Sequence, residues 1–462
     1  MITAKAFAGH HYAVYGLARS GLATAEALLA SGANVTAWDA KEEARGKAPQ
    51  GAEIANLDEV DLSQFDSLVV TPGLPLNRHP IAQRARKAGV EIIGDIELFA
   101  RARPELPPHK VVGITGTNGK STTTALVHHI LKTAGVPTTM GGNIGLPILA
   151  QNPLPEGGVY VLELSSYQID LTQSLDCDVA VLLNITPDHL DRYESFEAYA
   201  ASKERLFEVQ GPSGSIVSVG SDEHSRRIAE RFRNKLVPTS TDGPIVTGVS
   251  IGTASTSLPF GKPEVRENTL FIDDGDYGPQ ADWPALQGPH NALNVLAAEA
   301  AVYALDLRVP GPEGWWEAES LRTYPGLPHR MERVREKDGV LFVNDSKATN
   351  PTATAPALAA FESVRWILGG QAKTDNLDEC AAHFGHVRSA YTIGEAADLF
   401  ERLLAPHMPV KNCGKLDEAV RQAAQEAQPG DTVLLSPACA SFDQFRDFED
   451  RGDQFKALVG AL

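Results

Sequence analysis

Short apolar runs along this chain are followed repeatedly by glycine or polar residues and then by stretches with helical spacing. Residues 11–15 form the first such run, which ends at Gly16, and residues 20–30 carry apolar side chains at helical intervals. The same order recurs from the run at 111–115 to a late run at 433–435. This pattern predicts α/β domains built on largely parallel sheets.

Two proline-rich joints interrupt the pattern, at residues 103–108 and 324–330. Proline stiffens the chain and breaks regular elements, so such joints are typical of domain boundaries. A chain of 462 residues is long enough for three domains. We expect a Rossmann-like domain over 1–102, a central P-loop ATPase-like domain over 103–326 and a C-terminal Rossmann-like α/β domain over 327–462.

A glycine-rich turn at 116–119 follows the run at 111–115 and leads into Lys120 and Ser121, which open a predicted helix. Glycine lets backbone N–H groups converge on phosphate oxygens, and a helix N-terminus adds partial positive charge. Lys120 would reach the β- and γ-phosphates of a nucleotide, and Ser121 would bind Mg²⁺. Ile114 stands where the regular pattern G-x-x-x-x-G-K-[ST] requires its first glycine, so an ordinary strand-to-helix turn is the alternative.

The first domain opens like a dinucleotide-binding unit, but Ala18 occupies the position of the second glycine in G-x-G-x-x-G. A Cβ at that position would crowd a pyrophosphate, which disfavours NAD and leaves open a nucleotide bound in another way. Asp39 follows the second apolar run, at 34–38. Contact with a ligand and an exposed acid at a strand end are equally good interpretations of Asp39.

Polar residues follow two buried runs of the central domain. Glu163 ends the run that begins at 159, at a sheet edge where ligands bind, and a carboxylate there would help to hold the Mg²⁺ of a nucleotide. His189 follows the run at 179–185, where a ligand-binding histidine and an ordinary loop histidine are about equally compatible with the pattern. Asn291, near the start of an alanine-rich helix, is available to a ligand or to helix capping.

The segment 196–207 predicts a helix with an apolar stripe. Lys203 falls on that stripe, whereas Ser202, Glu204 and Arg205 lie off it. An inward ammonium must be paired, lose its proton or be chemically converted, because its burial is otherwise costly. The alternative is that the stem of the side chain packs while the amine reaches out to solvent.

A net charge of −18 argues against a nucleic-acid-binding surface, although local basic clefts remain compatible with it. The four cysteines show no C-x-x-C pairing and no histidine at zinc spacing, so we expect neither disulfides nor structural zinc. The sequence has no basic-then-apolar leader and no apolar stretch near the roughly 20 residues of a bilayer span. These features predict a soluble cytoplasmic protein without membrane insertion.

Seven short motifs in the second and third expected domains closely resemble those of the Mur ligases. They are Gly-Thr-Asn-Gly-Lys-Ser-Thr at 116–122, Gly-Gly-Asn-Ile-Gly at 141–145, Glu-Leu-Ser-Ser-Tyr-Gln at 163–168, Asp-His-Leu-Asp-Arg at 188–192, His290-Asn291, His329-Arg330 and Asn-Asp-Ser-Lys-Ala-Thr-Asn at 344–350. Two further segments, at 94–98 and 434–445, are similar to the branch of the family that adds D-glutamate. The resemblance covers nearly the whole chain.

This resemblance implies an enzyme that adds D-glutamate to UDP-N-acetylmuramoyl-L-alanine through an acyl phosphate, using ATP and two Mg²⁺ ions and acting as a monomer on small molecules. The implied nucleotide-binding residues are Gly116, Thr117, Asn118, Gly119, Lys120, Ser121, Thr122, Asn291, Arg330 and Asp345. The implied substrate-binding residues are Leu17, Ala18, Asp39, Gly73, Asn143, His189, His329, Lys347, Thr349, Lys373, Ser441, Phe442 and Phe448. The implied Mg²⁺ ligands are Ser121, Glu163, His189 and a carbamylated Lys203, and the implied catalytic residues are Lys120, His189 and Lys203.

Two departures from the family pattern concern substrate contacts. Ala40 stands where family members can carry a hydroxyl, and residues 369–373 read Gly-Gly-Gln-Ala-Lys in place of the more usual Gly-Gly-Asp-Gly-Lys. Two other functions are alternatives. A folylpolyglutamate synthetase or another ligase of the superfamily would join a different acid and amine, and a nucleotide-dependent binding or switch protein would keep these residues without turnover.

Overall fold

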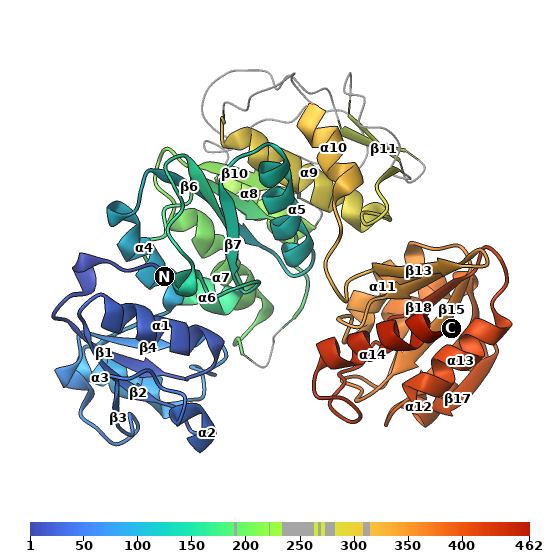
Figure 1. Ribbon diagram of the computed structural model, residues 1–462, viewed down its shortest axis with the longest axis horizontal. Helices are drawn as coiled ribbons and strands as arrows, with labels where there is room; N and C mark the ends of the chain where they lie inside the picture. Colours follow the sequence, from blue (N-terminus) through green and yellow to red (C-terminus); the bar gives the residue numbers. More distant parts are fainter. Residues whose placement is uncertain (189–191, 221, 233–262, 267–268, 273–281, 308–314) are drawn as a thin grey trace. The chain divides into compact units, whose positions relative to one another are not determined.

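The computed structural model describes the chain except residues 189–191, 221, 233–262, 267–268, 273–281 and 308–314 (Figure 1). Its described residues form three sheets of five or six strands, covered by helices, and one two-stranded sheet. The strand-then-helix order of the sequence is therefore confirmed as an α/β architecture. Among the described residues, no helix is both long and apolar enough to cross a membrane.

The first sheet has the Rossmann-like form predicted from the sequence. Its five strands run parallel in the order β3-β2-β1-β4-β5, so the strand order reverses beside β1, where such sheets bind ligands. The strands are β1 His11–Tyr15, β2 Asn34–Trp38, β3 Glu53–Ile54, β4 Ser67–Val70 and β5 Glu91–Ile93. The helices are α1 Arg19–Ala30, α2 Glu42–Arg45, α3 Pro80–Ala88 and α4 Asp95–Ala102.

The second sheet is also fully parallel, in the order β10-β9-β6-β8-β7. Every residue of β8 is buried, which explains why this strand is a continuous apolar run rather than an alternating one. The strands are β6 His109–Thr115, β7 Thr138–Gly142, β8 Gly158–Glu163, β9 Val179–Leu182 and β10 Ser215–Ser218. The helices are α5 Lys120–Thr133, α6 Ser166–Asp170, α7 Phe196–Glu208 and α8 Glu223–Arg231. Next come the two strands of the small sheet, β11 Pro263–Arg266 and β12 Thr269–Ile272. They are followed by helices α9 Pro289–Ala304 and α10 Trp315–Thr323.

The third sheet has the order β13-β14-β18-β15-β16-β17, parallel except for the β13–β14 hairpin at its edge. Two separate apolar clusters cover its two faces. The strands are β13 Glu332–Lys337, β14 Val340–Asn344, β15 Val364–Gly369, β16 Val387–Ile393, β17 Val410–Gly414 and β18 Thr432–Leu435. The helices are α11 Pro351–Ala359, α12 Ala397–Leu404, α13 Leu416–Glu426 and α14 Phe448–Ala461.

The chain divides into two compact units, of which one holds the first and second sheets and the other holds the third. The first two sheets share a single apolar core, in which the Phe99 ring of α4 lies 5.1 Å from the Tyr160 ring of β8. Joint burial of large aromatic side chains stabilises the packing of the two sheets against each other.

Candidate active site

The predicted phosphate loop connects the carboxyl end of β6 to the start of α5. Its two inner glycines adopt positive φ angles, 153° at Gly116 and 84° at Gly119. A Cβ at Gly116 would lie 3.0 Å from Leu183 Cβ, so the loop needs glycine both for its backbone angles and for its packing. The irregular glycine spacing therefore produces a real strand-to-helix loop, at the sheet edge where parallel sheets bind ligands.

A segment beyond β9 holds this loop in place. The Thr117 and Asn118 N–H groups donate to the backbone and side-chain oxygens of Asn184, each at 2.9 Å, and the Asn184 amide donates back to the Asn118 carbonyl at 3.1 Å. The Thr117 hydroxyl donates to the Thr186 carbonyl at 3.1 Å. The sequence reasoning missed Asn184, although a polar residue just past a buried strand is the signal that identified Glu163.

Helix α9 brings Asn294, three residues after the predicted Asn291, to the loop. The Asn294 Oδ1 atom accepts from the Thr123 hydroxyl at 3.3 Å and lies 2.3 Å from where a Cβ on Gly119 would stand. The Asn291 amide instead donates to the Gln287 carbonyl at 2.9 Å. The two asparagines are three residues apart and so share one helix face, a spacing that could have indicated Asn294 from the sequence.

Lys203 lies inside the protein, as its place on the apolar stripe predicts. Its side chain is among the largest that are fully buried, and its Nζ donates to the Gly116 carbonyl at 3.0 Å and lies 4.6 Å from the centre of the Tyr199 ring. Burial lowers the pKa of Lys203 well below its usual value, and the positive charge of Lys120 adds to that effect while Asp188 and Asp170 oppose it. The alternative in which the amine reaches solvent is therefore wrong.

The buried face of α7 is wider than the predicted apolar stripe, because Ser202 and Glu204, which lie off that stripe, are buried as well. The Ser202 hydroxyl donates to the Asp170 carboxylate at 2.7 Å, and Glu204 forms an ion pair with Arg231 of α8. A helix packed against α6 on one side and α8 on the other buries more than one stripe, which the apolar pattern alone did not reveal.

Glu163 ends β8 beside Asn143, whose amide donates to Glu163 Oε1 at 2.9 Å. The other carboxylate oxygen, Oε2, is buried and has no hydrogen-bond partner in the described part of the chain. A buried, unsatisfied carboxylate oxygen is costly unless something binds it, and a single carboxylate combined with phosphate oxygens is how proteins commonly hold Mg²⁺. The described residues contain no group of three or more His, Cys, Asp or Glu side chains that could hold a metal ion by themselves. The residues present thus fit a Mg²⁺ that arrives with a nucleotide, and His189, the other predicted ligand, lies outside the described residues.

In the first sheet, Asp39 links two chain segments at the ends of β1 and β2. Its carboxylate accepts from the Leu17 N–H at 2.7 Å and from the Lys41 N–H at 2.9 Å. The Leu17 side chain is buried, whereas Ala18 is exposed and precedes α1.

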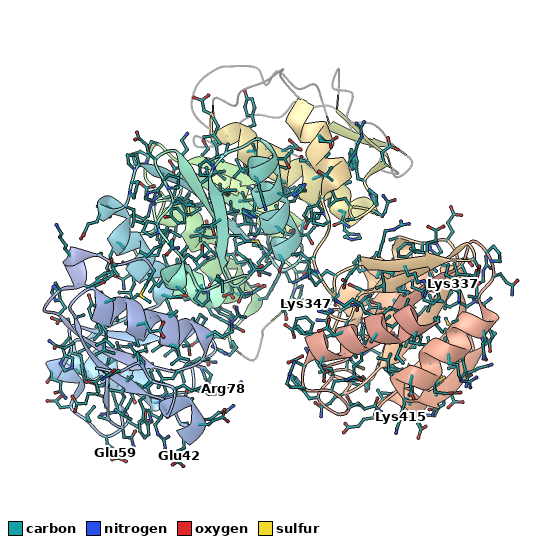
Figure 2. All side chains as sticks on the ribbon, in the orientation of Figure 1. Glu42, Glu59, Arg78, Lys337, Lys347 and Lys415 are labelled. Carbon is teal, nitrogen blue, oxygen red and sulfur yellow. The ribbon has the colours of Figure 1, made fainter. Side chains whose placement is uncertain are left out.

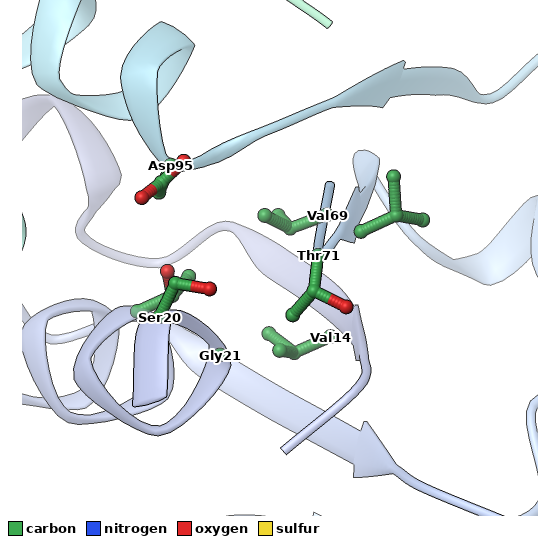
Figure 3. A pocket seen from close by; sticks show the side chains of 8 residues that line it. Val14, Ser20, Gly21, Val69, Thr71 and Asp95 are labelled. Carbon is green, nitrogen blue, oxygen red and sulfur yellow. The ribbon is translucent and has the colours of Figure 1, made fainter. Parts of the chain in front are cut away.

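A small pocket lies close to the β1 and β4 ends of this sheet. It is lined by Val14, Ser20, Gly21, Thr24, Val69, Val70, Thr71 and Asp95 (Figure 3). Gly73, in the turn after Thr71, has open space where a Cβ would stand, so the turn could accept a ligand at this point.

Around the third sheet, the loop before β13 carries Arg330 between two residues with positive φ, His329 at 61° and Met331 at 48°. The buried Asp345 carboxylate accepts from the Met331 N–H at 3.1 Å and from the Ser436 hydroxyl at 2.8 Å. Burial raises the pKa of Asp345 to about 7, although these hydrogen bonds and the Arg330 charge oppose the shift. Left-handed backbone at a non-glycine residue is strained and is often found at functional sites.

Five of the predicted substrate residues fall into two groups next to this loop. The Lys347 ammonium, labelled in Figure 2, lies 4.3 Å from the centre of the Phe448 ring, which in turn packs edge-on against the His329 ring at 6.0 Å. The Lys373 ammonium donates to the Thr349 hydroxyl at 3.4 Å. Two further predicted substrate residues follow β18, of which Ser441 is buried and Phe442 is 70% exposed.

Sequence reasoning also missed Arg451, which is fully buried in α14. Its guanidinium donates to the Ser346 hydroxyl and carbonyl at 2.9 and 2.8 Å, to the Cys439 carbonyl at 3.1 Å, and at 3.4 Å to the Gly369 and Ala440 carbonyls. It therefore joins three loops that follow different strands. Arg451 falls on an apolar helix face, the same anomaly that identified Lys203, so the signal was available.

These features define a class of protein: a multidomain α/β protein with a P-loop-like turn at the carboxyl edge of its second sheet. The chain belongs to the Mur ligase family. The family's middle domain matches residues 114–302, its glutamate ligase domain matches residues 329–439, and its MurD-like N-terminal domain matches residues 10–94.

Curated relatives match the sequence of this chain over its full length. The chain is 57% identical over 462 residues to a protein of Novosphingobium aromaticivorans (100% of this chain and 97% of the relative) and 55% identical over 468 residues to one of Sphingopyxis alaskensis (100% of both). Both relatives are named UDP-N-acetylmuramoylalanine--D-glutamate ligase.

Solved structures share the fold at low sequence identity. MurF ligase from Thermotoga maritima in complex with ADP superimposes with a TM-score of 0.58 at 17% identity, covering 98% of this chain and 96% of that one. UDP-N-acetylmuramate-alanine ligase MurC from the same organism gives a TM-score of 0.57 at 17% identity, covering 98% and 99%. The predicted Mur ligase fold is thereby confirmed.

Proposed function

We propose that this chain is an ATP-dependent ligase that joins D-glutamate to UDP-N-acetylmuramoyl-L-alanine in the synthesis of peptidoglycan precursors. The observation that carries the proposal is the convergence of Lys120 and Lys203 on the Gly116 carbonyl of the phosphate loop, at 2.8 and 3.0 Å. Full-length relatives with that activity in their names support the choice of substrates.

The reaction has two steps. The terminal carboxylate of UDP-N-acetylmuramoyl-L-alanine attacks the γ-phosphorus of ATP, which forms an acyl phosphate and releases ADP. The amine of D-glutamate then attacks the acyl carbon, loses a proton and expels inorganic phosphate, leaving an amide. Catalysis of phosphoryl transfer depends mainly on positioning and on stabilising charge, and Lys120 at the start of α5 would contribute to both.

The residues that would hold two Mg²⁺ ions are Ser121 and Glu163 for one, and His189 and Lys203 for the other. When bound, Mg²⁺ neutralises phosphate charge. Lys203 would serve as a carbamate, formed when its neutral amine attacks CO₂ and releases a proton. The lowered pKa of Lys203 favours that neutral amine, and a carbamate oxygen is a far better Mg²⁺ ligand than an ammonium.

Nucleotide binding is proposed for Gly116, Thr117, Asn118, Gly119, Lys120, Ser121 and Thr122, with Asn291, Arg330 and Asp345. The UDP-sugar substrate is proposed to contact Leu17, Ala18, Asp39, Gly73, Asn143 and His189. The residues proposed to lie near D-glutamate are His329, Lys347, Thr349, Lys373, Ser441, Phe442 and Phe448. The division at 102/103 and 326/327, action in the cytoplasm and a monomeric state are further parts of the proposal.

A phosphate-release assay tests the proposed function. ADP and phosphate should form only when ATP, Mg²⁺, UDP-N-acetylmuramoyl-L-alanine and D-glutamate are all present, in a panel that includes folates with L-glutamate and other acid and amino-acid pairs. Turnover only with a folate would identify the folylpolyglutamate alternative. ATP binding without any substrate-dependent ADP formation would indicate a switch protein.

A further inference from the structure

Three successive carbonyl oxygens in the turn after β4 converge on one side chain from beyond β9. Arg192 donates from Nη2 to the Leu74 carbonyl at 2.8 Å and the Pro72 carbonyl at 3.4 Å, and from Nη1 to the Gly73 carbonyl at 3.3 Å. The turn belongs to the first sheet, whereas Arg192 follows a strand of the second. One guanidinium therefore fixes the backbone of this turn from the side of the second sheet.

The guanidinium is itself held in a fixed plane. Its central carbon lies 4.2 Å from the centre of the Tyr167 ring, and Tyr167 stacks against Tyr193 with ring centres 6.0 Å apart and planes 15° apart. The Tyr193 hydroxyl donates to the Asp170 carboxylate at 2.8 Å. Stacking of this kind suits the flat guanidinium, which a lysine ammonium cannot replace. Tyr167 also lies four residues after Glu163, so the contact connects the turn to the chain segment that carries this carboxylate.

The two sheets are joined elsewhere without Arg192. The buried Glu97 carboxylate accepts from the Gln173 and Ser174 N–H groups at 2.7 and 2.9 Å, and the Gly94 N–H donates to the Leu171 carbonyl at 3.2 Å. Together with the shared apolar core, these bonds attach the sheets to each other. The attachment of the two sheets therefore does not depend on Arg192 alone, and its three hydrogen bonds to carbonyls all end on the turn.

We propose that Arg192 is a positioning residue for the UDP-sugar substrate: it holds the turn at 71–74 in the conformation and place in which Gly73 meets the substrate. This inference rests on the proposed function, which assigns Gly73 to substrate binding. A planar group with several donors can bind three carbonyls at once, whereas an ammonium is a compact point charge. A lysine at position 192 would keep the positive charge but should not hold the turn in place.

The test compares Arg192→Lys and Arg192→Ala with the control Arg227→Lys, whose side chain is 58% exposed and pairs with Glu223 in the same unit. Both Arg192 variants should raise KM for UDP-N-acetylmuramoyl-L-alanine about 10- to 100-fold, while KM for ATP and for D-glutamate stays within about 2-fold. The melting temperature of Arg192→Lys should equal that of the unmodified protein, and Arg227→Lys should match it in every measurement.

A KM for the UDP-sugar substrate in Arg192→Lys equal to that of the unmodified protein would overturn the inference. So would an equal rise in KM for ATP, or a lowered melting temperature in Arg192→Lys, because each would assign the contact a general structural role. Calorimetric titration of UDP-N-acetylmuramoyl-L-alanine into each protein without ATP separates the two proposals. Absence of binding to the unmodified protein would contradict the proposed function itself. Equal affinities of the unmodified protein and the Arg192 variants would contradict only the role of Arg192.

Discussion

Lys120 and Lys203 donate to the same acceptor, the backbone carbonyl oxygen of Gly116, from Nζ atoms 2.8 and 3.0 Å away. Burial lowers the pKa of Lys203, and the positive charge of Lys120 at the same carbonyl lowers it further. The lowered pKa of Lys203 and the position of Lys120 therefore depend on one arrangement, which neither helix produces alone.

Replacement of Lys203 tests the proposed site of the second Mg²⁺ ion. Lys203→Ala should lower kcat by about 100-fold or more, because it removes the group proposed to carry a carbamate. Added formate or acetate should restore part of the activity, and withdrawal of CO₂ should lower the activity of the unmodified enzyme but not of the variant. The control Lys47→Ala removes an exposed lysine and should behave as the unmodified enzyme. Normal activity in Lys203→Ala would contradict the proposal.

Replacement of Lys120 tests the phosphate loop. Lys120→Ala should abolish ATP turnover, since the positive charge at the start of α5 is lost. The fold should survive, because the hydrogen bonds that the change deletes, to the Gly116 and Thr117 carbonyls, are worth about 1 kcal/mol each. Substrate-dependent ADP formation and a thermal melt measure the two effects. Retained turnover would show that the loop does not bind the phosphates as proposed.

Two glycines that flank α5 form a matched pair. Gly119 and Gly135 both have positive φ, 84° and 76°, but only at Gly119 would a Cβ meet another residue, the Asn294 oxygen at 2.3 Å. Gly119→Ala should therefore weaken ATP binding by about 10-fold or more, whereas Gly135→Ala should cost only the backbone strain of about 1 kcal/mol. Fluorescence titration with an ATP analogue and thermal melting distinguish them. Equal ATP affinities in the two variants would argue against a role for the Gly119–Asn294 contact.

Asp345 should make the protein less stable as pH rises, whereas a carboxylate with a lowered pKa would make it more stable. Its folded-state pKa, about 7, lies above the value of roughly 4 expected in the unfolded chain. Between these values the folded state keeps a proton that the unfolded state has lost, so stability falls as pH rises through this window, by an amount on the order of 4 kcal/mol. Asp345→Asn should remove this fall, and the exposed Asp338→Asn should retain it. Urea unfolding from pH 4 to pH 8 is the measurement, and identical slopes in all three proteins would contradict it.

Local sequence pattern predicted much of the architecture. The order of apolar runs and helical stretches indicated parallel sheets, and the glycines before Lys120 located the loop, because strand burial and positive φ angles both constrain residues that are adjacent in the chain. An inward Lys203 was also predictable, since one charged residue on an apolar stripe has few explanations. The same test, applied to α14, would have found Arg451.

The local pattern could not predict hydrogen-bond partners that lie far apart in the sequence. Asn184 and Asn294 meet the phosphate loop from segments 66 and 171 residues away from their partners, and hydrogen bonds of this kind leave no periodic signal. The sequence by itself determined where strands, helices and the phosphate loop form and that Lys203 points inward. Only the tertiary structure decided which carbonyl two lysines share, which asparagine reaches Gly119 and how Arg192 holds the turn at Gly73, because those contacts depend on how separate elements pack in space.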